Sequence, residues 1–376
     1  MRYVPTARLI LVVMLLSFSV SASTLAAQSL VSSDVDSAKG RADRARSTSL
    51  RILPVLGSAP ETGFVGGATA LRVSSPIADT VTRASTEQVY VAYTAKQQFR
   101  AFVSTDRWSE GNRWGLNAQV EYQRYPQPYF GIGIDAPKSA EEWYEGRSLI
   151  ASATVLRHLT RAFYGQLGLR YTRTTIRDAE EGGVIELGEL TGARGGTAAQ
   201  IVTGLAWDSR DNVFAPAKGA YVLATVAHGG SVLGSDYQFG RYVADARRYW
   251  RVGRGVLAGQ AYLEATSGQA PFDQMALLGS SGAMRGYVHG RYRDHDLVAG
   301  QVEYRMPVVG RLGAAMFAGA GTVAPTMSRL SSSTVLPTVG GGARWLLLPK
   351  QRTTIRVDYA KGKSSSGFYV AFNEAF

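Results

Sequence analysis

The chain has no cysteine among its 376 residues. This absence excludes disulfide frameworks, thiolate zinc sites and cysteine nucleophiles, and it is typical of proteins that work in an oxidising compartment. The sequence also lacks HExxH, GxSxG, P-loop and dinucleotide-binding motifs. We therefore expect no enzyme, no catalytic residue, no cofactor and no metal.

Histidine is scarce, with only His158, His228, His289 and His295. His289 and His295 lie near Asp294 and Asp296, where a metal site or a hydrolytic Asp/His pair is conceivable. A polar loop in a wet interior is the interpretation that we favour.

The only long apolar run in the sequence lies near the N-terminus. It extends over 12 residues, from Leu9 to Val20. Arg2 and Arg8 precede this run and small residues follow it, which predicts a signal peptide over residues 1–27. A membrane-spanning helix needs about 20 apolar residues. Residues 28–50 are polar and predict a flexible periplasmic tail, and residues 51–376 form the remaining domain.

The formal net charge is +12, or 12 − 2 = +10 without Arg2 and Arg8. The basic residues are scattered singly and form no run, so we expect no nucleic-acid partner. A basic interior, or a surface that faces anionic lipid headgroups, fits the pattern better.

Apolar residues recur with period 2 from residue 51 onward. Between residues 114 and 122, for example, Trp114, Leu116 and Val120 alternate with polar or small residues. Such alternation predicts strands with one apolar and one polar face. Large charged residues on the polar faces, such as Glu121 and Arg170, favour a membrane barrel with a wet lumen over a soluble sandwich.

The predicted fold is therefore an all-β transmembrane antiparallel barrel of about sixteen strands. The predicted segments are 51–57, 63–73, 86–95, 99–107, 112–122, 147–158, 162–174, 196–207, 219–229, 236–250, 255–266, 296–307, 311–320, 335–347, 352–360 and 366–375. Connections after odd-numbered strands are mostly long and those after even-numbered strands mostly short, as in outer-membrane barrels. Two connections, 74–85 and 208–218, depart from this rule. Aromatic residues near strand ends predict interfacial girdles, with ordinary packing as the alternative: Trp108, Trp207, Trp250, Trp345 and Tyr249.

Two segments carry more specific signals. The first, Trp207 to Tyr221, predicts a charged turn at a barrel rim, with Asp208, Arg210 and Asp211 as an ion-pair cluster and Pro216 and Gly219 shaping the turn. The second contains Arg285-Gly286-Tyr287, before a strand that reads Glu303-Tyr304-Arg305.

Together with VGGGARW (339–345) and the final GFYVAFNEAF, these segments resemble the BamA/TamA superfamily, also called the bacterial surface antigen family, over residues 50–376. The resemblance implies that the loop 267–295 folds back into the lumen. There Arg285 would pair with acidic and aromatic groups of the wall. Glu303 and Arg305 lie on the inward face of their strand, and Gly286 allows a sharp turn. We expect Arg285, Gly286, Tyr287, Glu303 and Arg305 to form a structural lock.

The sequence departs from the family pattern in two places. Gly319 stands where the family usually has an aspartate, so the lock is expected to be weaker or to rely on Glu303 alone. Residues 28–50 are too few for the periplasmic POTRA domains of the family's assembly factors, and Pro60 to Phe64 (PETGF) resembles a branch without them.

These features predict a Gram-negative outer-membrane protein that acts in membrane biogenesis, or in protein or lipid insertion or translocation with a partner. A passive, anion-preferring pore is the alternative. The expected partners are outer-membrane lipids, lipopolysaccharide, the barrel-assembly machinery and a periplasmic protein.

The last residues predict a C-terminal assembly signal within a closing strand. Counting back by two from Phe376 places Phe372, Val370 and Phe368 on the lipid face, with Tyr369 and Ala371 inward.

Overall fold

The computed structural model describes residues 46–76, 82–160, 162–329, 335–349 and 352–376. The predicted signal peptide, and the tail up to residue 45, lie outside the described residues. No helix in the described part of the chain is long and apolar enough to cross a membrane.

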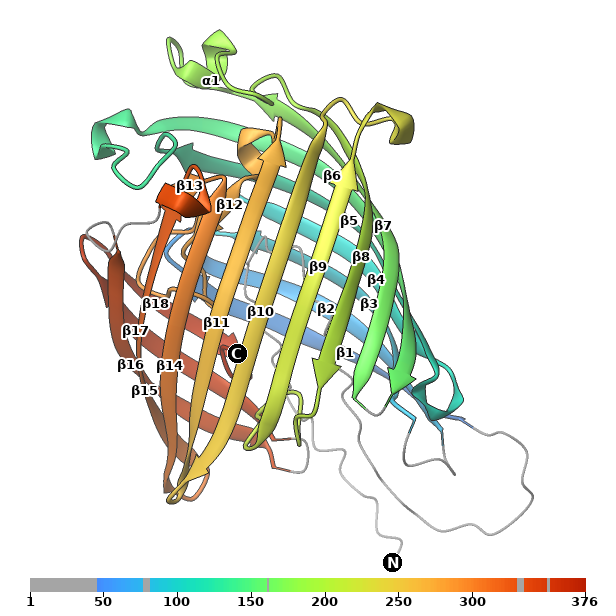
Figure 1. The fold of residues 1–376 in the computed structure, drawn as a ribbon. Coiled ribbons are helices and arrows are strands. Elements are labelled where there is room, and N and C mark those ends of the chain that lie inside the picture. Colours follow the sequence, from blue (N-terminus) through green and yellow to red (C-terminus); the bar gives the residue numbers. More distant parts are fainter. Residues whose placement is uncertain (1–45, 77–81, 161, 330–334, 350–351) are drawn as a thin grey trace, which may run out of the picture.

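Sixteen antiparallel strands close into one barrel, which confirms the predicted fold (Figure 1). Two further strands, β12 (Ala276–Leu278) and β13 (Tyr292–Asp294), pair with each other in a separate small sheet. The barrel strands are β1 (Arg46–Ala59), β2 (Gly63–Pro76), β3 (Ser85–Thr94), β4 (Phe99–Trp108), β5 (Trp114–Tyr129), β6 (Glu142–Thr160), β7 (Phe163–Arg177), β8 (Gly196–Asp208), β9 (Gly219–Gly229), β10 (Phe239–Val252), β11 (Gly255–Gly268), β14 (Asp296–Val309), β15 (Leu312–Ala324), β16 (Leu336–Leu348), β17 (Thr353–Gly362) and β18 (Ser366–Phe372).

Every predicted strand segment corresponds to one barrel strand, but several boundaries differ. Strand β1 begins at Arg46, within the predicted tail, because residues 46–50 continue the pairing with β2 as far as Pro76. Strands β5 and β6 extend through residues for which the sequence predicts a loop, since their pairing continues to Tyr129 and Glu142. Polar composition alone did not reveal this extension.

The alternation along the strands separates an outward face from an inward face. Trp114, Leu116 and Val120 of β5 are exposed on the outside of the barrel. Glu121 points inward, where it is buried and pairs with Arg100 at 2.6 Å. A charged group is tolerated on the inner face because a partner of opposite charge lies beside it.

The connections divide the barrel into two rims. The long-loop rim carries residues 130–141, 178–195, 269–295 and 325–329, and the short-turn rim carries tight turns such as 253–254 and 310–311. Trp207, Trp250 and Trp345 are exposed close to the short-turn rim, as a girdle requires. Trp108 and Tyr249 do not belong to it, because their side chains are buried on the inward face.

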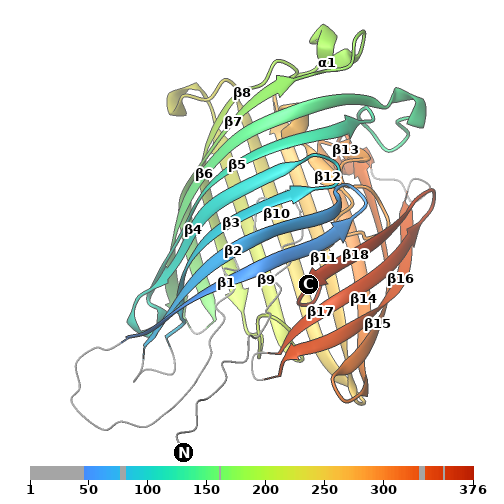
Figure 2. The same ribbon diagram turned by 180° about the vertical axis from the view of Figure 1, so that it is seen from behind.

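Strands β1 and β18 meet at a seam that is far less paired than any other junction (Figure 2). Only Ser58 and Val370 are register partners across it among the described residues. By contrast, β1 pairs with β2 at 14 positions and β18 pairs with β17 at 7. The barrel is therefore closed, but its closure depends on very few backbone hydrogen bonds at this junction.

The end of β18 corrects our prediction for the closing strand. Phe368 is exposed as expected, but Phe372 is buried and Val370 partly buried, and both pack against inward residues of the first strands, including Val55 and Tyr90. The apolar face of β18 thus lies against the inner surface of the wall next to the seam. A period of two fixes which residues share a face, but not which side of a neighbouring strand that face meets.

Phe376 is also placed differently from the prediction. Strand β18 ends at Phe372, and Asn373 turns the chain with a positive φ of 58°. Phe376 then packs inside the lumen against Tyr249 and Ala258 and is only 4% exposed. It is not part of the sixteenth barrel strand and does not face lipid.

Candidate functional site

The loop between β11 and β14, residues 269–295, folds into the barrel and is called the lumenal loop here. Its buried side chains Leu278, Met284 and Tyr287 pack against wall residues that include Leu297 and Val323. The short β12–β13 sheet stiffens the loop. An apolar contact of this kind holds a long loop in one place, although its backbone is irregular.

Arg285 is the central polar residue of the loop. Its guanidinium is fully buried and forms ion pairs with Glu303 of β14 and Asp358 of β17, each at 2.6 Å. It also lies 3.4 Å from the centre of the Phe317 ring. Two carboxylates and an aromatic face compensate for the water that a buried guanidinium has lost.

Asp358 is the residue that sequence reasoning missed. The sequence predicts a lock that is weaker, or that relies on Glu303 alone, because Gly319 replaces the aspartate that the family usually has. Asp358 instead supplies a second carboxylate from β17, which lies two positions round the barrel from β15, the strand that carries Gly319. It was recognisable as a polar residue on the inward face of its strand, but its distance from Arg285 could not be read from local spacing.

More arginines join the same cluster, which we call the acid–arginine network. Arg305 contacts Glu303 at 2.7 Å, and Arg344 contacts Asp358 at 2.5 Å and Glu374 at 2.8 Å. The network contains four arginines and three acids, a formal balance of 4 − 3 = +1: Arg285, Arg305, Arg344, Arg356, Glu303, Asp358 and Glu374. It joins the lumenal loop to β14, β16, β17 and the end of the chain.

Gly286 and Tyr287 fix the loop backbone beside Arg285. Gly286 has a φ of 102°, and a Cβ there would lie 3.0 Å from the Gly362 nitrogen. Its N–H donates to the Tyr369 hydroxyl at 2.7 Å. The Tyr287 hydroxyl donates to the Pro337 carbonyl at 2.6 Å. The structure thus brings all five predicted lock residues to one part of the lumen, with Arg305 touching Glu303.

The motif after β8 forms a turn on the short-turn rim, as predicted, but its ion pairs are arranged differently. Asp208 binds Arg210 at 2.9 Å. Asp211 instead pairs with Arg352, in the turn between β16 and β17, at 2.9 Å. It also accepts the N–H groups of Ala217 and Lys218.

The other two motif residues shape this turn. Pro216 is buried. Gly219 has a φ of 103°, and a Cβ there would lie 2.2 Å from the Ser209 carbonyl oxygen, so only glycine fits. Burial would raise the pKa of Asp211, but the two N–H groups and the Arg352 guanidinium hold it below its usual value.

The same turn reaches across the short-turn rim, and we call residues 209–218 the strap. Phe214, near its middle, is buried against Leu71 and Val73 of β2 and against Ala84. The Phe214 carbonyl faces the N–H of Glu374 at 3.4 Å. The departure of this connection from the short-turn rule therefore has a structural cause, since the additional residues extend across the opening.

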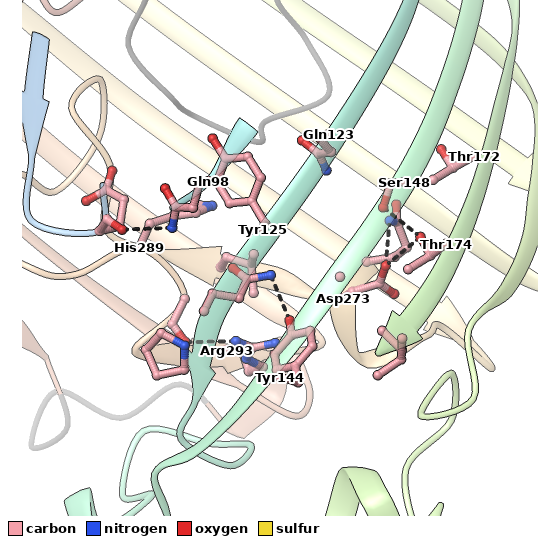
Figure 3. Close-up of a pocket in the computed structure, with 18 of the residues that line it drawn as sticks. Gln98, Gln123, Tyr125, Tyr144, Ser148, Thr172, Thr174, Asp273, His289 and Arg293 are labelled. Atoms are coloured by element: carbon pink, nitrogen blue, oxygen red, sulfur yellow. Dashed lines mark hydrogen bonds between the residues drawn. The ribbon is translucent and has the colours of Figure 1, made fainter. Parts of the chain in front are cut away.

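A cavity of about 80 Å³ lies between the lumenal loop and the wall (Figure 3). Asp273 and Arg293 of the loop face Tyr144 and Thr174 of the wall, and Thr174 donates to Asp273 at 3.1 Å. Glu61, in the turn after β1, also lines this cavity, and its carboxylate oxygens are buried. Burial raises the pKa of Glu61 to about 7.

The histidines that we had considered as ligands do not gather. The His289 ring bonds the Gly279 carbonyl, whereas the His295 ring contacts Thr266 at 3.1 Å. Burial lowers the pKa of His289 to about 4. Within the described ranges, no group of three or more His, Asp or Glu side chains is placed to hold a metal.

The Omp85 superfamily domain matches residues 83–376. The chain belongs to the Omp85 superfamily. No curated protein matches the sequence. Among solved structures, the barrel is similar to BamA from Haemophilus ducreyi lacking POTRA domains 1–3, with 15% identity, a TM-score of 0.62, and coverage of 88% of this chain and 70% of that one. It is also similar to CdiB from Acinetobacter baumannii, with 12% identity, a TM-score of 0.53 and coverage of 87% of this chain.

The chain spans 65% of that CdiB chain. At these identities the two similarities show a shared barrel fold. Relatives of this Omp85 barrel are outer-membrane proteins.

Proposed function

We propose that this barrel is an outer-membrane protein that inserts or translocates client chains through its seam, together with a partner. The observation that carries the proposal is the single register pair, Ser58 with Val370, between β1 and β18. Membership of the Omp85 superfamily and the similarity to BamA and CdiB support this class of activity.

The seam is suited to accept another strand. Along β1, residues 46–57 have no register partner on β18, so backbone groups at this edge can pair with an incoming chain. Exposed Leu50 and Ile52 lie on the outward face of the same edge. Unpaired backbone groups are costly in a bilayer, which favours their pairing with a client strand when the seam opens.

The proposal is tested by closing the seam covalently. Because the native chain has no cysteine, Ser58→Cys with Val370→Cys creates the only disulfide pair. A cysteine pair at Tyr359 and Phe368, which are partners within β17–β18, provides the matched control. In proteoliposomes that contain the partner, we expect oxidation to stop assembly of an added small barrel client in the first variant only, and reductant to restore it.

Equal client assembly by the oxidised seam variant would overturn the proposal. The partner is identified first, by crosslinking in cells and co-purification. Lipopolysaccharide, the surrounding lipids and the barrel-assembly machinery are the further partners that we propose, the last during the protein's own insertion.

A passive pore is the second candidate, and the net charge of 12 − 2 = +10, without Arg2 and Arg8, favours anions for it. The buried lumenal loop and the acid–arginine network oppose it, because both occupy the lumen. Planar-bilayer recordings separate the two functions. A large, stable, anion-selective conductance supports the pore, whereas small flickering steps support an occluded barrel.

A further inference from the structure

The strap begins and ends on the wall opposite the seam. Strands β8 and β9, which it joins, lie halfway round the strand order from β1 and β18. A connection of ten residues is much longer than an antiparallel pair of strands needs. Its additional length carries Phe214 to the far side of the opening.

On one side, the strap contacts the strands that follow the seam. Phe214 is buried with Leu71, Val73 and Ala84, the last of which directly precedes β3. Asp208, at the base of the strap, also lies 3.8 Å from Arg83. Because β2 is paired with β1 along its whole length, a contact that fixes Leu71 and Val73 also restrains the β1 edge.

On the other side, the strap contacts the strands that precede the seam. Asp211 pairs with Arg352, which directly precedes β17, and the Phe214 carbonyl faces the N–H of Glu374. The Glu374 carboxylate is itself held by Arg344 and Arg305 of the acid–arginine network. The strap is thus connected to the β17–β18 edge through two separate contacts.

We propose that the strap holds the two flanks of the seam together and that its release is the step that regulates lateral opening. This inference rests on the proposed function for its biological meaning, but its physical content is independent of any client. One register pair gives the seam little backbone hydrogen bonding, so the packing of Phe372 against Val55 and the strap contacts that bridge the two flanks together set the balance between closed and open forms.

The contacts of the strap differ in how much each one stabilises the closed seam. The Asp211–Arg352 pair is partly exposed, with 43% of the arginine side chain accessible, so water screens it strongly. Phe214 is buried against apolar side chains, and its burial is the larger contribution. Among the strap residues, Phe214 is therefore the one whose loss should open the seam most.

Spin labels at Leu50→Cys of β1 and Phe368→Cys of β18 report the seam directly. Both side chains are exposed and point outward from the strands that flank the seam. Pulsed electron paramagnetic resonance on the full chain in nanodiscs then gives the distribution of distances between the two spin labels. We expect Phe214→Ala to raise the open-to-closed ratio about tenfold. We expect Arg352→Gln to raise it by a smaller factor.

Val213→Ala is the matched control, because Val213 is the exposed neighbour of Phe214. Heat modifiability on semi-native gels shows which variants are folded. If Phe214→Ala does not fold, Phe214→Leu and Arg352→Gln serve in its place. An unchanged distance distribution in the folded strap variants would overturn the inference.

Failure of the strap and failure of the proposed function give different results. If strap variants widen the seam but the Ser58–Val370 disulfide leaves client assembly unchanged, the strap regulates the seam and the insertion function is wrong. If the disulfide stops assembly but strap variants leave the seam distances unchanged, insertion stands and the inference about the strap is wrong.

Discussion

Arg285 and Asp358 are 73 residues apart in the sequence, yet Nη1 of the arginine lies 2.6 Å from Oδ2 of the aspartate, and both side chains are fully buried. The contact joins the lumenal loop to β17, a strand next to the one that borders the seam. The inside of the barrel and its seam are therefore mechanically connected through charged groups.

Asp358→Asn should destabilise the folded barrel strongly. It leaves Arg285, Arg344 and Arg356 with one carboxylate fewer, and breaking a buried pair costs about 3–5 kcal/mol. Arg285→Ala and Glu303→Ala should act in the same direction. Urea unfolding in detergent micelles and heat modifiability on gels measure the loss.

Arg72→Gln is the control for these charge changes. Its ion pair with Glu87 lies on the exposed outer face and should contribute about 0–1 kcal/mol. Equal stability of the Asp358 and Arg72 variants would show that the acid–arginine network does not stabilise the barrel.

Gly286→Ala should loosen the lumenal loop even though it changes no charge. The backbone has a φ of 102°, and the new methyl group would lie 3.0 Å from the Gly362 nitrogen and 3.1 Å from the Thr338 hydroxyl. We expect faster proteolysis within residues 269–295 and a lower unfolding temperature. Gly282→Ala, in the same loop, meets only the Ala375 carbonyl at 3.4 Å and should change little.

The β1–β2 turn should make stability depend on pH near neutrality. The pKa of Glu61 is raised by burial from 4.5 to about 7, so the folded state holds a proton that the unfolded state has already released. The contribution of Glu61 to stability should therefore be fully present below about pH 4.5, should fall as the pH rises to about 7, and should then level off. Unfolding temperatures of the wild type between pH 4.5 and 8 measure this decrease.

Glu61→Gln should remove that decrease and should be more stable than the wild type at pH 8. Glu110→Gln is a suitable control, because Glu110 lies in an exposed turn at the opposite rim. A wild-type pH profile that Glu61→Gln leaves unaltered would contradict the assignment.

Much of the fold could be predicted from the sequence, because alternation is a local property. The period of two identified all sixteen strands, and it placed Glu121, Glu303 and Arg305 on the inward face. The pairing of Arg285 with Glu303 followed from a family motif together with this alternation.

The features that were missed depend on distance across the lumen. Asp358, Phe214 and the inward position of Phe372 are each set by contacts between segments far apart in the chain. Local spacing shows which face a side chain occupies, but not what lies opposite it once the barrel closes. The excess length of residues 208–218 was visible, whereas its reason was not.

Phe376 provides a direct test of whether the end of the chain acts in assembly or in packing. Its ring is buried beside Tyr249 and Ala258, and its carbonyl accepts a hydrogen bond from Arg305 at 2.8 Å. Phe376→Ala should leave the amount of inserted barrel near the wild-type level and lower the free energy of unfolding by about 3 kcal/mol. Phe368→Ala, on the exposed face of β18, should cost much less. If Phe376→Ala instead reduces insertion while the inserted fraction keeps wild-type stability, the residue acts as the assembly signal that its terminal position first indicated.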